Sequence, residues 1–140
     1  MHAPPPFIRH LTPRLVAASA PSSSAGAHPV VLVTERLRRP LARISGPEGF
    51  ESLLRRANAL AAREAAALQN VRIATRGAVE LTDAAPDDPG IRAQAAAAIL
   101  AHFLGLLVAF IGEPLTLGMI LEAWPELAAD PDFLGNEDNQ

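Results

Sequence analysis

Cysteine and lysine are both missing from this chain of 140 residues. Without cysteine there is no disulfide, no thiolate metal ligand and no cysteine nucleophile. All 12 basic side chains are arginine, and the formal net charge is −3. A nucleic-acid-binding surface needs a strong excess of positive charge, so we expect no nucleic-acid partner. The absence of cysteine is compatible with a reducing cytoplasm, where we expect the protein to reside.

Aromatic residues are scarce as well, at 4% of the chain, although hydrophobic residues make up 49%. Alanine supplies much of that apolar content and buries little surface. The length predicts a single domain. Its core should be thin, with helices that approach one another on small side chains.

The longest hydrophobic run is Ile91–Gly112, and no residue from Ala95 to Gly112 carries a formal charge. A helix that is apolar on all sides is either a buried core helix or a membrane span. The run has just the length that a span requires. However, His102 and Gly105 lie near its middle and no basic cluster flanks it. We therefore expect a buried central helix over 91–112, with membrane association as the alternative.

The remaining apolar residues recur at spacings of three and four, so the predicted fold is mainly α, with about four helices. The first should start at Pro29, with a kink at Arg39–Pro40, because proline lacks the amide that a helix interior needs. The second should follow a Ser45 cap and run to about Leu68. After the central helix, the last should span Glu113 to about Ala123.

Between the second helix and the central helix, the apolar residues alternate instead. Val71 and Ile73 precede a turn at Arg76-Gly77, and Val79 and Leu81 follow it. This pattern predicts a short β-hairpin over 71–81, which must lean on the helices to be stable.

The two ends of the chain differ from this middle part. Residues 1–28 are rich in proline, alanine and serine, a composition that predicts a disordered arm with, at most, a helical turn near Ile8–Val16. Residues 126–140 are acidic and predict a flexible tail. The domain boundaries expected from the sequence are therefore a single helical domain over 29–125, with the arm before it and the tail after it.

One face of the central helix is a seam of small residues beside a histidine: Ala98, Ala101, His102, Gly105 and Ala109. Small side chains let another helix backbone approach closely. Either the alanine-rich face of residues 57–67 in the same chain or a second copy of the central helix can fill this seam. The seam therefore leaves a homodimer open.

The one basic cluster in the chain is an arginine patch: Arg36, Arg38, Arg39 and Arg43. One interpretation is a solvated helix face paired with nearby glutamates. The other is a docking patch for an acidic protein partner or a phosphate group.

We predict no catalytic, cofactor-binding or metal-binding residue. His102 has no acidic residue one helical turn away, and the chain has no HExxH, GxSxG or glycine-rich phosphate loop. The sequence therefore favours a non-enzymatic protein without a cofactor.

Several short motifs resemble those of a family of small, uncharacterised bacterial helical proteins. They are the Leu37–Leu41 segment LRRPL, Gly49-Phe50 with Leu53-Leu54, the Leu104–Glu113 segment LGLLVAFIGE, Leu115-Thr-Leu117 and Ala123-Trp-Pro125. Gly118 departs from the pattern, which has a long polar residue there. The resemblance covers roughly 37–125, implies a bacterial, intracellular protein and supplies no catalytic residue.

The function that these observations favour is that of a small regulatory or scaffold protein, which acts by helix-mediated self-association or by binding a protein partner. Two alternatives stay open. One is a membrane-associated protein that uses the helix over 91–112. The other is a small-molecule sensor with an apolar pocket lined by Phe103, Phe110 and Trp124.

Overall fold

The computed structural model describes residues 6–19, 29–65, 68–69, 71–74, 79–81 and 88–129. These residues form helices α1 (Pro6–Ala18), α2 (Pro29–Ala61), α3 (Pro89–Ile111) and α4 (Glu113–Ala123), and a 3-10 helix, η4 (Pro125–Ala129). Strands β1 (Val71–Ile73) and β2 (Val79–Leu81) form a two-stranded antiparallel sheet. The predicted fold class, mainly α with a short hairpin, is confirmed.

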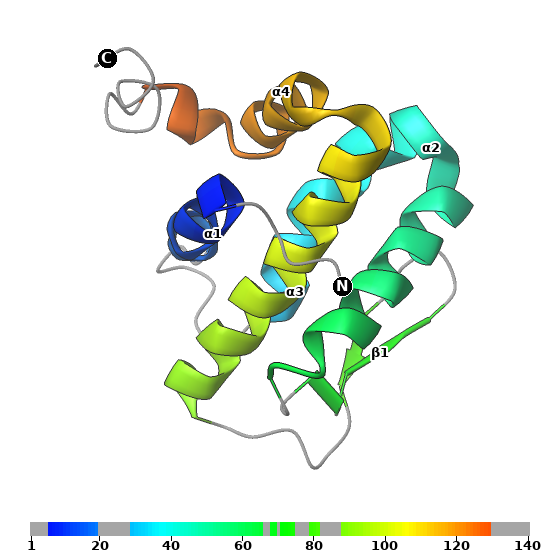
Figure 1. Cartoon of the computed structure of the whole chain (residues 1–140). Helices are drawn as coiled ribbons and strands as arrows, with labels where there is room; N and C mark the ends of the chain where they lie inside the picture. The colour runs from blue at the N-terminus through cyan, green and yellow to red at the C-terminus, as the bar shows by residue number, and fades with distance from the viewer. Residues whose placement is uncertain are drawn as a thin grey trace.

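Helix α3 runs through the centre of the molecule, and α1, α2 and α4 all pack against it (Figure 1). Asp88 caps its start, because the carboxylate accepts hydrogen bonds from the backbone N–H groups of Gly90 and Ile91. Gly112 ends it, with a φ of 90°. Gly90–Ile111 is the one segment among the described helices that is long and apolar enough to cross a membrane. Its most apolar window is 56% buried inside the protein.

Helix α2 is two helices joined at Gly46, and both halves lie along α3 (Figure 1). The break between the two halves near residues 45–47 was predicted, but the prediction of a kink at Arg39–Pro40 is wrong. Inside α2 only Gly46 leaves the helical region. Pro40 is buried, and its packing in the core offsets the one backbone hydrogen bond that its ring removes. Ser45 does not cap the second half, because its hydroxyl donates to the Leu41 carbonyl.

The second half of α2 packs edge to face on α3 through the rings of Phe50 and Phe103, whose centroids lie 5.9 Å apart. This half ends at Ala61 rather than near Leu68, and residues 62–64 form a turn. That turn decides where Glu64 lies.

Helix α1 corrects the expectation of a disordered arm over residues 1–28. Pro6–Ala18 is helical and buries Ile8, Leu11 and Leu15 against the core. Pro13 lies inside this helix, and the Thr12 hydroxyl donates to the Arg9 carbonyl that Pro13 leaves without its helical partner. The rest of the predicted arm, residues 1–5 and 20–28, is outside the described residues except for Ser19.

The C-terminal side of the domain also extends beyond its predicted boundary. Residues Pro125–Ala129 form η4 rather than the start of a flexible tail, and Leu127 is buried. Trp124 is fully buried, and its indole N–H donates to the Ser19 hydroxyl at 2.7 Å. The residue that follows α1 therefore contacts the residue that follows α4. Residues 130–140 are outside the described residues.

The hairpin confirms the prediction over 71–81. Val71 pairs with Leu81, Arg72 with Glu80, and Ile73 with Val79. Val71 and Ile73 turn inward against the core, while Arg72 points outward and forms a cross-strand ion pair with Glu80. The turn at Arg76-Gly77 is outside the described residues.

Candidate functional site

The predicted arginine patch does not form a single exposed basic surface. Arg38 pairs with Glu35 on its own helix and lies over the Phe50 ring. Arg43 pairs with Glu122 of α4. Arg39 is exposed and forms no hydrogen bond or ion pair with another described residue. The charge of this cluster is therefore largely balanced within the chain.

Arg36 has a structural role that the sequence did not reveal. Its guanidinium binds Glu126 through two hydrogen bonds of 2.9 and 2.8 Å. It also donates to the Ala123 and Ala18 carbonyls, which end α4 and α1. One side chain of α2 thus holds together the ends of two other helices. These partners lie 18 to 90 residues away in sequence, so local spacing gave no signal for them.

The predicted small-residue seam is covered largely by the chain itself. Ala101 is 4% exposed and His102 is 7% exposed. Ala98 and Gly105 are half-buried, and Ala109 at the far end is exposed. The part of the seam near Ala98 and Ala101 faces α1 across a cleft of about 350 Å³. The lining residues are Arg9, Thr12, Pro13, Glu64, Ala65, Gln94, Ala97, Ala98 and Ala101.

Glu64 and His102 meet beside this cleft. His102 Nε2 lies 2.9 Å from Glu64 Oε2, and Arg9 donates to the same oxygen at 3.3 Å. The hydrogen bond with His102, above all, lowers the pKa of Glu64 below its usual value of 4.5, and Arg9 adds to this effect. Glu64 is therefore ionised at neutral pH and accepts the His102 Nε2–H. The pair anchors the turn after α2 to α3.

This pair offers little chemistry beyond anchoring. No group of three or more histidine and acidic side chains converges anywhere in the described part of the chain. No serine or threonine hydroxyl lies within hydrogen-bond distance of His102 among the described residues. A nucleophile that the histidine could activate is therefore not present in the described residues.

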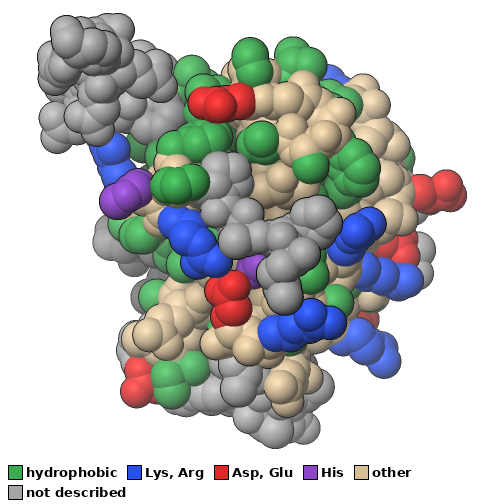
Figure 2. Space-filling view, viewed as in Figure 1, with side chains coloured by type: hydrophobic (Ala, Val, Ile, Leu, Met, Phe, Trp, Pro, Cys, Tyr) green, Lys and Arg blue, Asp and Glu red, His purple; other side chains and the backbone are tan. Residues whose placement is uncertain are grey.

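The exposed hydrophobic side chains give a different candidate site. Phe110 and Leu115 are 63% and 64% exposed, and Ile44 is 57% exposed. Phe110 ends α3 and Leu115 begins α4, on either side of Gly112. The Arg43–Glu122 ion pair brings the residue before Ile44 to α4. We call Phe110 and Leu115 the apolar corner, and Figure 2 shows hydrophobic side chains in the part of the molecule around α4.

The pocket expected between Phe103, Phe110 and Trp124 does not exist in this arrangement. Phe103 and Trp124 are almost fully buried in the core, whereas Phe110 points outward at 63% exposure. The three side chains therefore do not line one cavity. Of these three, only Phe110 is available to a partner.

No protein-family model, curated protein or solved structure matches this chain. The resemblance to small bacterial helical proteins stays a prediction for that reason.

Proposed function

We propose that this protein is a small, non-enzymatic regulatory or scaffold protein that self-associates through the apolar corner. The observation that carries the proposal is the exposure of Phe110 and Leu115, at 63% and 64%, on either side of the Gly112 bend between α3 and α4. Burying two large hydrophobic side chains stabilises a complex by roughly 1.5–3 kcal/mol each. An apolar patch of this kind marks an interaction site more often than a scattered single residue does.

The charge around the corner favours a second copy of the chain over a charged partner. Helix α4 has two charged residues: Glu122, near its far end, is neutralised by Arg43, and Glu113 lies in its first turn. Such a patch offers neither a basic nor an acidic partner electrostatic complementarity. Two identical corners related by a twofold axis are complementary in their apolar character.

The corner replaces the seam as the self-association surface in this proposal. The seam offers little free surface, because Ala101 and His102 are nearly buried. Its exposed end, Ala109, directly precedes Phe110. The helix that mediates association is thus still the central one, but it acts through its last turn.

Sedimentation velocity over a range from low to high micromolar concentration tests the proposal. The wild-type chain should shift from monomer toward dimer. The double variant Phe110→Ser, Leu115→Ser should have a dimer dissociation constant at least about tenfold higher, because each lost apolar contact removes over 1 kcal/mol. Both side chains are mostly exposed, so the variant should keep its fold.

Ile91→Ser is the matched control. Ile91 is 40% exposed and lies at the opposite end of the same helix, so its loss should leave the dimer unchanged. A wild-type protein that stays monomeric at high micromolar concentration contradicts the proposal. So does an equal effect of Ile91→Ser.

The proposal places the protein in the bacterial cytoplasm. The lack of cysteine and the resemblance to small bacterial proteins support this placement. The alternative is membrane association, since α3 is long enough to span a membrane. A cytoplasmic location is supported if the intact chain stays in detergent-free buffer and does not partition into lipid vesicles.

A further inference from the structure

We propose that the cleft between α1 and α3 binds a free α-amino acid with an aliphatic side chain. Helix α1 lies beside α3 (Figure 1), and the turn at residues 62–64 completes the cleft. Its volume of about 350 Å³ is within the range of about 300–1,000 Å³ that is usual for small-molecule sites. The apolar corner shares no residue with this cleft.

Three polar side chains that line the cleft come from three different segments and have unused hydrogen-bonding groups. Arg9 of α1 makes one hydrogen bond, from Nη2 to Glu64, whereas a guanidinium has five N–H donors. Glu64 uses only Oε2, so its Oε1 accepts no hydrogen bond from a described residue. Gln94 of α3 is exposed, and its amide bonds to no described residue. Free donors and free acceptors therefore line the same cleft.

The charges of the cleft select a zwitterion. Nη2 of Arg9 lies 3.3 Å from Oε2 of Glu64, so the two side chains together carry no net charge. A ligand with one charge is attracted by one of them and repelled by the other, whereas a ligand with both charges is attracted by both. The ammonium and carboxylate of an α-amino acid are bonded to one carbon and lie about 3 Å apart. This spacing matches that of the Arg9–Glu64 pair.

The existing contact between Arg9 and Glu64 does not block such a ligand. It is a single long bond between side chains that are 49% and 42% exposed, and ion pairs of this kind contribute little to stability. His102 is only 7% exposed, and its Nε2 lies 2.9 Å from Glu64 Oε2. The histidine therefore holds the carboxylate at the cleft, while Arg9 is able to turn toward the carboxylate of a ligand.

The rest of the lining is aliphatic and favours an aliphatic ligand side chain. Small side chains leave room above them and offer no hydrogen-bonding group. The one further polar residue, Thr12, already donates its hydroxyl to the Arg9 carbonyl. The aliphatic lining residues are Pro13, Ala65, Ala97, Ala98 and Ala101.

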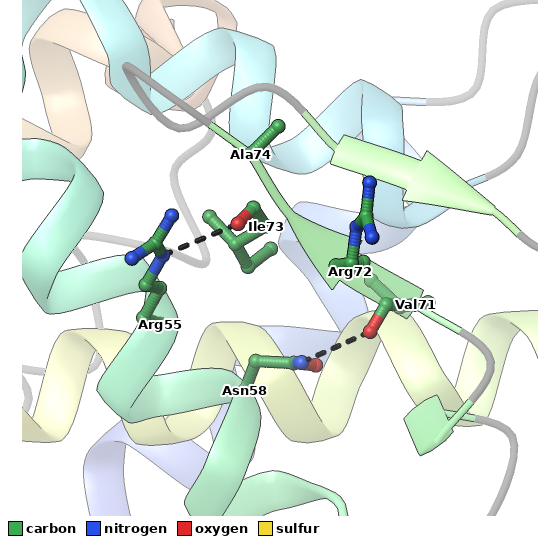
Figure 3. Close-up of a pocket in the computed structure, with 6 residues that line it drawn as sticks. All are labelled: Arg55, Asn58, Val71, Arg72, Ile73 and Ala74. Atoms are coloured by element: carbon green, nitrogen blue, oxygen red, sulfur yellow. Dashed lines mark hydrogen bonds between the residues drawn. The ribbon is translucent and has the colours of Figure 1, made fainter.

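The larger groove between the second half of α2 and the hairpin is a poorer site, although its volume is about 580 Å³ (Figure 3). Arg55 and Asn58 reach from α2 to the backbone of β1 with hydrogen bonds of 3.2 and 3.3 Å. The other charged residue that lines it, Arg72, pairs with Glu80. The chain itself therefore occupies most of the hydrogen-bonding groups of this groove.

Titration of the full chain, labelled with ¹⁵N, with four small molecules tests the proposal. L-Leucine has all the required groups, glycine lacks the side chain, N-acetyl-L-leucine lacks the ammonium, and L-leucinamide lacks the carboxylate. L-Leucine should shift the amide signals of Arg9, Glu64 and Gln94 and raise the Tm, because it binds the folded state. Each of the other three should bind at least about fivefold more weakly, since each lacks one of the contacts.

Variants of the two charged residues give a reciprocal test. Arg9→Gln should weaken L-leucine at least about fivefold and leave L-leucinamide less affected, because Glu64 still binds the ammonium. Glu64→Gln should do the same with N-acetyl-L-leucine as the less affected ligand. The matched controls are Arg39→Gln and Glu113→Gln, which change exposed residues outside the cleft and should not weaken L-leucine.

A third variant tests the aliphatic lining without a change of charge. Ala98→Leu places a larger side chain in the cleft and should abolish the binding of L-leucine, whereas Ala98→Ser should not. Because Ala98 is half-buried, thermal unfolding checks that both variants keep their fold. Arg9 and Gln94 are exposed, so Arg9→Gln and Gln94→Ala test the site even if Ala98→Leu fails to fold. Gln94→Ala should weaken L-leucine several-fold.

Three results overturn the proposal. The first is that L-leucine leaves the amide signals of the cleft unshifted at tens of millimolar. The second is that L-leucinamide or N-acetyl-L-leucine binds the wild-type chain as tightly as L-leucine does. The third is that Arg9→Gln affects binding no more than Arg39→Gln. None of these results depends on the oligomeric state, so this proposal and the self-association proposal fail independently.

Discussion

At the scale of single residues, Arg36 shows how position in the fold changes the meaning of a side chain. In the sequence it belongs to a run of arginines, and a docking patch was one interpretation of that run. In the structure its guanidinium binds Glu126 and the carbonyls that end α1 and α4. Its 30% exposure sets it apart from Arg43, at 60%. A half-buried arginine with three partners stabilises the fold.

We predict that Arg36→Gln lowers the free energy of unfolding by about 1–3 kcal/mol at neutral pH, since it leaves two carbonyls and a carboxylate without their donor. Urea denaturation measures this. The control Arg72→Gln removes a cross-strand pair whose side chains are 78% and 51% exposed. It should change stability by less than about 1 kcal/mol. A control effect as large as that of Arg36→Gln would contradict the assignment.

The same variant should show a specific pH dependence. The hydrogen bond from Arg36 lowers the pKa of Glu126 below its usual value of 4.5. A carboxyl whose pKa is lower in the folded state stabilises the fold above the unfolded pKa and loses this effect as the pH falls through the folded pKa. The stability difference between wild type and Arg36→Gln should therefore shrink below about pH 4.5. The part due to the two carbonyls should persist.

At the scale of elements, two glycines play opposite roles. Gly46 joins the halves of α2 with φ 77° and ψ 165°, a region that other residues rarely adopt. Gly118 lies inside α4, is exposed, and a Cβ placed on it would meet no neighbouring atom. The first glycine is needed for the bend, whereas the second only weakens a helix.

We predict that Gly46→Ala destabilises the protein by about 1–3 kcal/mol, through backbone strain alone, because a Cβ there has open space. Gly118→Ala should stabilise it by about 0.5–1 kcal/mol, the difference in helix propensity. Thermal unfolding followed by circular dichroism gives both values. Shifts of the same sign in the two variants would show that the bend at Gly46 is not required.

The helices themselves were largely predictable from local sequence. The central helix was predicted close to its observed bounds, because the residues that cap it, Asp88 and Gly112, act on neighbours within one turn. The break near Gly46 was predicted too, although Ser45 does not form the cap that the prediction assumed. The predicted kink at Pro40 was wrong. The rule that proline disrupts a helix interior takes no account of how a particular proline packs. Only tertiary contacts decide whether such a residue is tolerated.

At the scale of the whole molecule, α1 closes the fold. Its composition alone predicted disorder, yet Ile8, Leu11, Leu15 and Val16 are buried against the other helices. Ser19, just after it, accepts the indole N–H of Trp124. A 13-residue helix with an internal proline is marginal in isolation. Its stability comes from the surface on which it packs.

We predict that a chain lacking residues 1–19 does not fold cooperatively. Four buried aliphatic side chains contribute roughly 1.5–3 kcal/mol each, and the total approaches the entire stability of a small domain, about 5–15 kcal/mol. In a thermal unfolding experiment, the truncated chain should show no sigmoidal transition. A synthetic peptide of residues 6–19 added in trans should restore it. A truncated chain that melts like the intact one would show that α1 lies outside the folding unit.

The sequence by itself determined the fold class, the central helix, the hairpin and most helix ends, because hydrophobic period and capping act over a few residues. It did not determine which polar groups meet. Arg36 reaches Glu126 across 90 residues, and His102 reaches Glu64 across 38. Only the packing of the helices decided that the seam is largely covered and that Phe110 and Leu115 stay exposed. Such contacts depend on the relative placement of whole elements, which no local pattern specifies.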